Sequence, residues 1–415
     1  MFGYSLAPDG SLPRRSLSFA AASTALILCF FIASIPVPMM AVWTQSHHLS
    51  TSQIAFTVVS YFAGCIFTLI FLARLSNFLG RKPAVLLSLT LGILANVLFC
   101  FSTQAYELYL GRFLQGLCCG LISSSGMSWV VDTSPSKRAW LGTALTAAGP
   151  NIGLAAGTLA TGFILEYGLL DPTALFVGGI VLLTCCCALV CVGSETLRFG
   201  TEPLLKVLTP RVALPPRLCR LFVVAAAGFM GTWGIGAFFQ GFSAHLATAL
   251  FNDTNAFYSG LTYLFIIVPN ATAGILIGRY RPSRALPVLF TLFFISANCL
   301  FIALSLENLP FFITATVCCG FASGGICTAA LKFLILDTTI KERAGVIAAL
   351  YLLAYCGSGT PNLLIGTIGA SASQATLNLG FHVWILLTFS LAMGMFLIIR
   401  AHPSEAESLR YARYA

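Results

Sequence analysis

Two long apolar runs of the sequence are joined by the short polar stretch ARLSNFLGRKP, residues 73–83. Gly80 allows a tight turn with positive φ, and Pro83 suits the first turn of a following helix. Arg81 and Lys82 hold such a turn in water, on the side of a membrane where cations collect. The stretch therefore predicts a sharp turn between two membrane-spanning helices.

The composition supports a membrane protein. Of the 415 residues, 58% are hydrophobic and 8% are charged, and the mean hydropathy is +0.91. Soluble domains carry about 25% charged residues, so this apolar content exceeds what a water-soluble globule of this size can enclose. Lipid-spanning helices need roughly 20 apolar residues and satisfy their own backbone hydrogen bonds. We therefore predict an all-α polytopic membrane protein.

Twelve apolar runs are long enough to span a bilayer. A polar, proline-rich segment at 195–218 separates six runs in 1–194, the expected N-terminal bundle, from six in 219–415, the expected C-terminal bundle and short tail. The predicted spans are 19–44, 53–76, 84–101, 106–131, 140–166, 172–194, 219–247, 255–278, 286–306, 308–336, 344–369 and 380–400.

The cations predict the orientation. With the N-terminus inside, every Lys and Arg except Arg112 and Lys332 falls in a cytoplasmic segment, as the positive-inside rule expects. We therefore expect a multi-pass protein of the cell inner (plasma) membrane with both termini in the cytoplasm. The net charge of +9 then reflects topology and attraction to anionic lipid rather than nucleic-acid binding. The 15 cysteines lie almost entirely in apolar runs and predict no metal site or other cofactor.

The two halves resemble each other. The fourth run ends in DTSPSKRA, residues 132–139, and the tenth in DTTIKERA, residues 337–344. Both segments begin Asp-Thr and end Arg-Ala, and shifting residues 73–74 by the same interval leads to Gly278-Arg279. Repeated halves with a binding site at their interface are typical of secondary transporters.

On these residues the chain is identified as a member of the major facilitator superfamily (MFS). The family signature Gly-x-Leu-x-Asp-Arg-x-Gly-Arg-Lys resembles residues 73–82, where Leu75, Gly80, Arg81 and Lys82 match. Ala73, Asn77 and Phe78 depart from it. The resemblance implies the MFS fold, two six-helix bundles that alternate access to a central cavity.

The resemblance also implies a cytoplasmic gate. Arg81 is expected to pair with Asp132, and the neutral Asn77 predicts a looser latch than the family's acid gives. The second-half loop around Arg279 is basic but lacks the Gly-Arg-Lys core, so the latch should be asymmetric. The alternative is a turn that only fixes topology. The expected gating residues are Ala73, Asn77, Gly80, Arg81, Lys82, Asp132, Arg138, Gly149, Pro150, Arg279, Asp337 and Arg343.

The fourth helix contains a cation at membrane depth. Leu108, Arg112, Gln115 and Gly116 resemble the family's Leu-x-x-x-Arg-x-x-Gln-Gly stretch. Arg112 is expected to face the cavity and to hold an anion or tune a proton site; the alternative is an arginine that snorkels or caps carbonyls. The expected residues for substrate or coupling are Arg112, Gln115, Asn151, Trp233, Gln240, Tyr351 and Tyr355.

The fifth helix carries Gly149, Gly153 and Gly157 at four-residue spacing, with Pro150 inserted. Its GPxxG core partly resembles the antiporter motif of the drug-efflux (DHA1-like) branch; plain helix packing is the alternative. No acid lies in the middle of an apolar run, so proton coupling is implied by the resemblance alone. Glu107, Asp132 and His245 are the candidate proton carriers.

The helix-4 and GPxxG resemblances imply a transporter that exports a small amphipathic or anionic compound by proton antiport. An uptake symporter or facilitator for an organic anion or polar nutrient stays open, as does a protein that senses or scaffolds. The sequence contains no nucleotide-binding or hydrolase motif, so no enzyme activity is expected. The expected partners are a small-molecule substrate, protons and the lipid bilayer, with the protein acting as a monomer and binding no nucleic acid.

Overall fold

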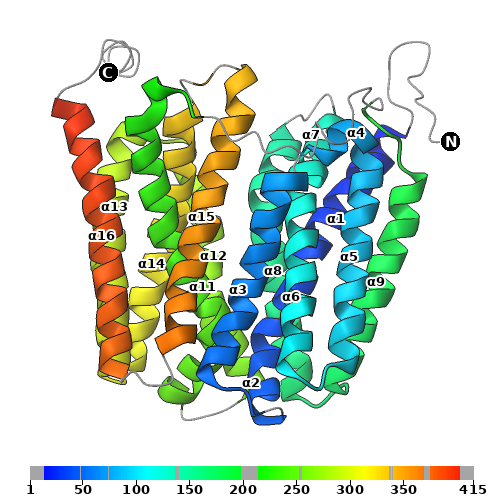
Figure 1. The fold of residues 1–415 in the computed structure, drawn as a ribbon, viewed down its shortest axis with the longest axis horizontal. Helices are drawn as coiled ribbons and strands as arrows, with labels where there is room; N and C mark the ends of the chain where they lie inside the picture. Colours follow the sequence, from blue (N-terminus) through cyan, green and yellow to red (C-terminus); the bar gives the residue numbers. More distant parts are fainter. Residues whose placement is uncertain are drawn as a thin grey trace. The chain divides into compact units, whose positions relative to one another are not determined.

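The computed structural model describes residues 14–46, 48–72, 74–135, 140–197, 214–251, 255–335, 338, 340–368 and 374–401. These residues form helices and connecting turns without any β-strand. Twelve helices or helix pairs are long and apolar enough to cross a membrane, and their ribbons follow one another through the colours of Figure 1. The predicted all-α architecture with twelve spans is therefore confirmed.

The first six spans contain several interruptions. Their elements are α1 (Arg15–Ser34), α2 (Pro36–Ser46), α3 (Thr51–Phe67), the π-helical η1 (Thr68–Leu72), α4 (Leu75–Leu79), α5 (Arg81–Phe101), α6 (Ala105–Leu121), the π-helical η2 (Ile122–Gly126), α7 (Met127–Thr133), α8 (Trp140–Glu166) and α9 (Pro172–Val192).

The last six spans are longer uninterrupted helices. They are preceded by the 3₁₀ turn η4 (Pro216–Leu218) and comprise α11 (Cys219–Phe251), α12 (Ala256–Ile277), α13 (Pro282–Ser305), α14 (Leu309–Ile335), α15 (Ile340–Ile368) and α16 (Gln374–Ala401).

The chain forms two compact units. Unit 1 comprises Met1–Arg211 together with Gln240–Thr248 and Asp253–Leu264, and unit 2 comprises Val212–Phe239, Ala249–Asn252 and Phe265–Ala415. Unit 1 therefore includes short segments of α11 and α12 in addition to the first half of the sequence. The division at 195–218 stays a prediction, and residues 198–213 of that linker lie outside the described part of the chain.

The first span breaks at Ile35, between α1 and α2. Pro36 and Pro38 cause the break because neither has an N–H to donate to the carbonyl four residues earlier. The carbonyls of Ile32 and Ser34 are the ones that lose this donor. Ser34 and Ile35 are nevertheless buried, so any released carbonyl at this depth needs another donor.

Glycines bring helix backbones into direct contact inside unit 1. A Cβ on Gly64 of α3 would lie 2.2 Å from the Phe113 carbonyl oxygen, and one on Gly116 of α6 would lie 2.0 Å from the Tyr61 carbonyl oxygen. In α8, added Cβ atoms on Gly153 and Gly157 would likewise strike the carbonyl oxygens of Ile27 and Phe31 in α1. Glycine at these positions thus sets the spacing of the α3–α6 and α1–α8 pairs.

A similar contact recurs in unit 2. Added Cβ atoms on Gly320 and Gly324 of α14 would lie 2.3 Å and 1.9 Å from the carbonyl oxygens of Ile266 and Asn270 in α12. Gly320 lies 204 residues after Gly116 of α6, and Gly324 lies 204 residues after Gly120. This interval is within one residue of the 205 residues that separate the two Asp-Thr segments. The internal resemblance of the two halves therefore extends to the backbone packing between their second and fourth spans.

The π-helical turn η1 packs against the end of α6, next to where the π-helical turn η2 begins. Thr68, which begins η1, donates from Oγ1 to the Gly64 carbonyl at 3.1 Å and to the Leu117 carbonyl of α6 at 3.4 Å. A Cβ on Gly120, just before η2, would lie 2.6 Å from the Thr68 Cβ. The described residues of α12 and α14 contain no such turns, so this feature distinguishes the two units.

We expect Gly116→Val to destabilise unit 1, because its side chain would have to separate the α3 and α6 backbones. Overpacking of this kind costs about 1–3 kcal/mol, which should lower the apparent unfolding temperature in detergent. Gly178→Val is the matched control, since a Cβ there meets nothing within 4 Å. Equal unfolding temperatures for the two variants would contradict the assignment of Gly116 as a spacer.

Candidate functional site

The polar centre of unit 1 is Arg112 on α6. Its side chain is 1% exposed. Nη1 donates to the Ala33 carbonyl of α1 at 3.0 Å and to Gln115 Oε1 at 2.9 Å, and Nη2 donates to Gln240 Oε1 at 3.3 Å. The guanidinium carbon lies 4.6 Å from the centre of the Tyr61 ring, in cation–π geometry.

The break in the first span explains why these donors lie here. Gln115 donates from Nε2 to the Ile32 carbonyl at 3.1 Å, and this is a carbonyl whose helical donor is lost to Pro36. Arg112 serves the adjacent carbonyl of Ala33. The Arg-x-x-Gln pair of α6 thus caps the broken end of α1, which is the carbonyl-capping role considered as an alternative from the sequence.

The hydrogen bonds of Arg112 to Ala33, Gln115 and Gln240 use only its two Nη atoms. The Nε of Arg112 is buried and has no acceptor. The groups that interact with it electrostatically are the neutral side chains of Tyr61, Tyr263, Cys65 and Cys119. Within the described residues no carboxylate pairs with Arg112, since the ion pair found there joins Arg81 and Asp132. The site therefore offers a positive charge and a free donor to an anionic group.

The structure brings three of the seven expected substrate residues together, namely Arg112, Gln115 and Gln240. Three others, Trp233, Tyr351 and Tyr355, form a separate aromatic cluster in unit 2. Asn151 is half-buried on α8 beside Pro150. Sequence reasoning did not include Tyr263, whose fully buried ring interacts with both Arg112 and Gln240.

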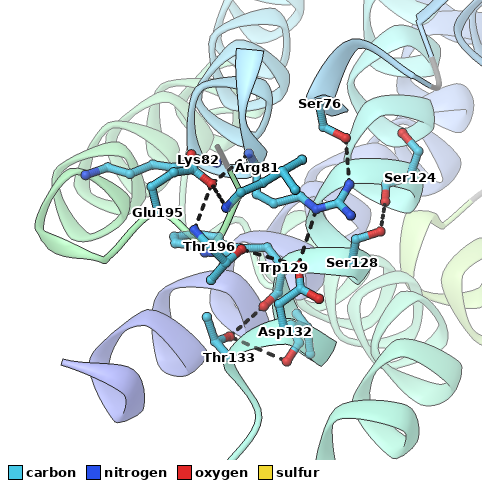
Figure 2. A network of polar contacts seen from close by, with 12 residues as sticks. Ser76, Arg81, Lys82, Ser124, Ser128, Trp129, Asp132, Thr133, Glu195 and Thr196 are labelled. Carbon is cyan, nitrogen blue, oxygen red and sulfur yellow. Dashed lines mark hydrogen bonds and ion pairs between the residues drawn. The ribbon is translucent and has the colours of Figure 1, made fainter. Parts of the chain in front are cut away.

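A second polar network lies at the start of α5 (Figure 2). Arg81 Nε lies 3.3 Å from Asp132 Oδ2, and Arg81 Nη1 donates to Ser76 Oγ at 2.8 Å. Thr196 Oγ1 donates to the same Asp132 oxygen at 3.3 Å. The ion pair expected from the sequence is therefore present, although both partners are partly exposed and such pairs contribute at most about 1 kcal/mol.

The stronger element of this network is Glu195, which the sequence reasoning did not single out. Its carboxylate is 7% exposed and accepts from the backbone N–H of Arg81 and Lys82, both at 2.9 Å. It also accepts from the N–H of Thr196 and Leu197, at 2.8 Å and 3.0 Å. Glu195 thereby caps the positive N-terminus of α5 with a full negative charge.

Gly80 and Lys82 complete the junction between α4, α5 and the end of α9. Gly80 has φ +95°, and a Cβ there would lie 2.6 Å from Glu195 Oε2. Lys82 donates from Nζ to the carbonyls of Cys191 and Gly193, at 2.6 Å and 2.9 Å, which caps the C-terminus of α9. The Gly-Arg-Lys core of the turn is thus held by one buried acid and two freed carbonyls.

A protein-family model described as Major Facilitator Superfamily matches residues 22–361. The chain belongs to the major facilitator superfamily. It is accordingly a multi-pass membrane protein with the fold of MFS transporters, and the polar turn described above is the superfamily signature seen in three dimensions.

Individual superfamily members resemble this chain over shorter stretches. Multidrug resistance protein 2 of Bacillus subtilis is 24% identical over 39% of this chain and 40% of its own length. The uridine/deoxyuridine transporter of Lactococcus lactis is 29% identical over 26% of this chain and 24% of its own. The class B tetracycline resistance protein of Escherichia coli is 37% identical over 22% of this chain and 23% of its own. The matches thus span less than half of each relative.

Two solved structures share the fold over nearly the whole chain. A bacterial homologue of the human lysosomal transporter Spinster superimposes with a TM-score of 0.67 at 13% identity, covering 94% of this chain and 99% of that one. The human organic anion transporter MFSD10 gives a TM-score of 0.62 at 15% identity, covering 92% and 100%. Both show the MFS fold.

Several expected gating residues lie outside the described part of the chain, namely Ala73, Arg138 and Asp337. Asn77 lies in α4 and Arg343 in α15, but their side chains are not among those described. Arg279 is exposed in the turn after α12. The expectation of a loose, asymmetric latch stays a prediction.

Gly149 and Pro150 lie inside α8, which packs on α1. A Cβ on Gly149 would meet Leu26 of α1 at 3.2 Å, and Gly153 and Gly157 lie against the α1 backbone. This geometry accounts for the glycine spacing by helix packing, the alternative kept beside the antiporter motif.

The candidate proton carriers lie away from Arg112. Glu107 caps α6 by accepting from the N–H of Gln104 at 3.0 Å, and Asp132 belongs to the network of Figure 2. His245 is exposed on α11. Lys332, the other cation at membrane depth, donates to the carbonyls of Gly278 and Tyr280 at the end of α12.

We expect Glu195→Gln to destabilise the protein, because an amide cannot accept from four N–H groups and carries no charge for the α5 N-terminus. Hydrogen bonds to charged groups contribute about 1.5–3 kcal/mol each, so the apparent unfolding temperature in detergent should fall. Glu166→Gln at the exposed end of α8 is the control and should leave it unchanged. A Glu195→Gln variant as stable as the control would show that the cap is dispensable.

We expect Gly80→Val to impair transport more than Pro282→Val in the corresponding loop of unit 2. A β-branched residue at φ +95° is strained and meets Glu195, at a cost of about 1–3 kcal/mol, whereas Pro282 occupies an undemanding first position of α13. Initial transport rates, normalised to the amount of protein in the membrane, make the comparison. Equal losses would contradict an asymmetric gate.

Proposed function

We propose that this superfamily member exports a small amphipathic or anionic compound in exchange for protons. The observation that carries the substrate class is Arg112, a cation with a free buried donor and neutral neighbours. Burying an unpaired charge is costly, and an anionic solute would relieve that cost while it is bound.

The direction of transport rests on relatives and on the fifth span. Two of the similar proteins are named for resistance to drugs or tetracycline. The GPxxG core at Gly149 and Pro150 resembles the antiporter motif of the DHA1-like branch. These features support efflux by proton antiport. We further propose that the protein works as a monomer in the inner membrane, with both termini in the cytoplasm as the distribution of its cations favours.

The network around Gly80 gives the proposed mechanism a cytoplasmic gate. Glu195 and Lys82 tie the start of α5 to the end of the sixth span, so these two ends would move as one body when access alternates. A gate that breaks one exposed ion pair rather than a buried cap needs only a modest free-energy change. The Arg81–Asp132 pair is therefore the proposed moving contact, and Glu195 the fixed one.

Uptake by symport or facilitation is the second candidate. It is favoured by the position of the acids, because those in the described residues lie at helix ends rather than beside Arg112. A protein without a proton carrier near its cation would move an anion or a polar nutrient down its gradient. The similar uridine/deoxyuridine transporter agrees with a polar cargo.

Purified protein in liposomes with an enclosed pH-sensitive dye distinguishes these functions. A panel of organic anions, nucleosides and drugs is added outside, and solute and proton fluxes are recorded together. Opposite fluxes support antiport. Fluxes in the same direction, or solute flux without protons, would overturn antiport in favour of the second candidate.

We expect Arg112→Gln to reduce transport of organic anions at least tenfold, because a neutral amide cannot replace the charge that binds the anion. Lys332→Gln removes the other cation at membrane depth, which serves only the end of α12, and should retain most activity. The measurement is the initial rate at low substrate concentration, with the unfolding temperature of each variant determined alongside. Equal rates for wild type and Arg112→Gln would exclude Arg112 from anion binding.

A further inference from the structure

We propose that unit 2 contains a subsite for a flat aromatic ring of the transported compound, formed by Trp233, Tyr351 and Tyr355 with the Cys327 thiol at its edge. The inference rests on the proposed function for the class of cargo, but its geometry lies entirely within unit 2. It adds a ring requirement to the anionic group assigned to Arg112.

The three rings form one cluster, in which Trp233 contacts both tyrosines; we call this cluster the pincer. The Trp233 ring on α11 meets Tyr351 at 5.6 Å and 75°, and Tyr355 at 5.0 Å and 77°, both edge to face. Tyr351 and Tyr355 are four residues apart on α15 and so share one face of that helix. Phe229 lies one turn before Trp233 and meets Tyr351 at 5.8 Å and 72°, which fixes the back of the cluster.

This cluster differs from the aromatic core of the same unit. Phe239, Phe290, Phe301 and Phe312 are at most 1% exposed, whereas Trp233 and Tyr351 are half-buried. Tyrosine and tryptophan also carry polar groups that ordinarily require a partner or water. Rings of this kind are suited to line a space that a solute can enter rather than to fill a dry core.

Trp233 lies on a helix whose other side chains nearby are buried. Phe229, one turn earlier on the same face, is 1% exposed, Thr232 is 3% exposed and Ile235 is 0% exposed. The lipid-facing positions of unit 2 instead carry aliphatic side chains such as Val288, Leu387 and Leu397. A half-buried indole on so buried a helix gives this cluster a ring surface that a solute can contact.

A thiol lies at the edge of the cluster. Cys327 on α14 is half-buried, and its Sγ lies 3.6 Å from Thr232 Oγ1. The thiol also interacts with the side chains of Trp233 and Tyr351. A ring bound against Trp233 would therefore cover Cys327.

The chemistry of the pincer selects a neutral aromatic surface. Among the contacts of the described side chains around Trp233, the partners are Tyr351, Tyr355, Phe229 and Cys327, none of them an ion. Edge-to-face arrangements favour a flat conjugated ring over a saturated ring of similar size. The cargo class is therefore an aromatic organic anion, whose ring binds here. An organic cation held over the same rings is the competing outcome.

The test is equilibrium binding of radiolabelled 2-naphthoate to the purified full-length protein, with its saturated analogue decahydro-2-naphthoate and with benzyltrimethylammonium as competitors. We expect 2-naphthoate to bind, the saturated acid to compete at least tenfold more weakly, and the cation not to compete. Trp233→Leu should abolish the preference for the aromatic acid, and Trp233→Phe should restore part of it. Phe294→Leu, which removes a ring of the Phe294–Phe389 pair elsewhere in unit 2, is the matched control and should leave binding unchanged.

Alkylation of Cys327 by N-ethylmaleimide, quantified by mass spectrometry of its peptide, locates the bound ring. At about ten times the dissociation constant, 2-naphthoate should slow this reaction about tenfold and should leave the exposed Cys219 unaffected. Equal binding of aromatic and saturated acids, tighter binding of the cation, or binding that neither depends on Trp233 nor protects Cys327 would overturn the subsite. Transport of organic anions with no ring preference would overturn it while leaving the proposed function intact. Binding of the aromatic ring without transport of any organic anion would overturn the proposed function and leave the subsite intact.

Discussion

A positive charge buried in an apolar bundle constrains much of unit 1. Arg112 neither reaches water nor meets a carboxylate among the described residues, so neutral acceptors must stabilise it. These acceptors are the Ala33 carbonyl next to the break in the first span and the side chains of Gln115 and Gln240. Pro36 leaves the Ile32 carbonyl without its helical donor, and Gln115 of the Arg-x-x-Gln pair donates to that carbonyl.

The two units repeat a helix-packing pattern but differ in their polar chemistry. Gly116 in α6 and Gly320 in α14 give the same close backbone approach of the second and fourth spans of each half. Unit 1 adds a buried cation and the acid Glu195 to this scaffold, whereas unit 2 adds an aromatic cluster in which Trp233 and Tyr351 are half-buried. The duplicated scaffold therefore supports two different kinds of surface, one suited to charge and one to flat apolar groups.

The sequence predicts the features that depend on composition and on residues near one another in the chain. Twelve spans and the tight turn at Gly80 follow from such patterns, and the Arg81–Asp132 pair follows from the family resemblance of the same motif. Glu195 does not, because an acid just after an apolar run is common, and only the fold brings it to the α5 N-terminus, more than one hundred positions away in the chain. Tyr263 and the π-turns escape prediction for the same reason: they are determined by packing between distant segments.

The π-turn η2 also changes the directions in which side chains point along the fourth span. A π-turn accommodates one residue more than an α-turn, and one residue corresponds to a rotation of about 100°. The face that carries Arg112 on α6 therefore does not continue as a single stripe into α7, where Asp132 pairs with Arg81. In an unbroken α-helix the Arg112 and Asp132 side chains would point about 200° apart, and the extra residue of the π-turn changes this angle by about 100°. One transmembrane segment can in this way direct its buried cation toward α1 and its terminal acid toward α5.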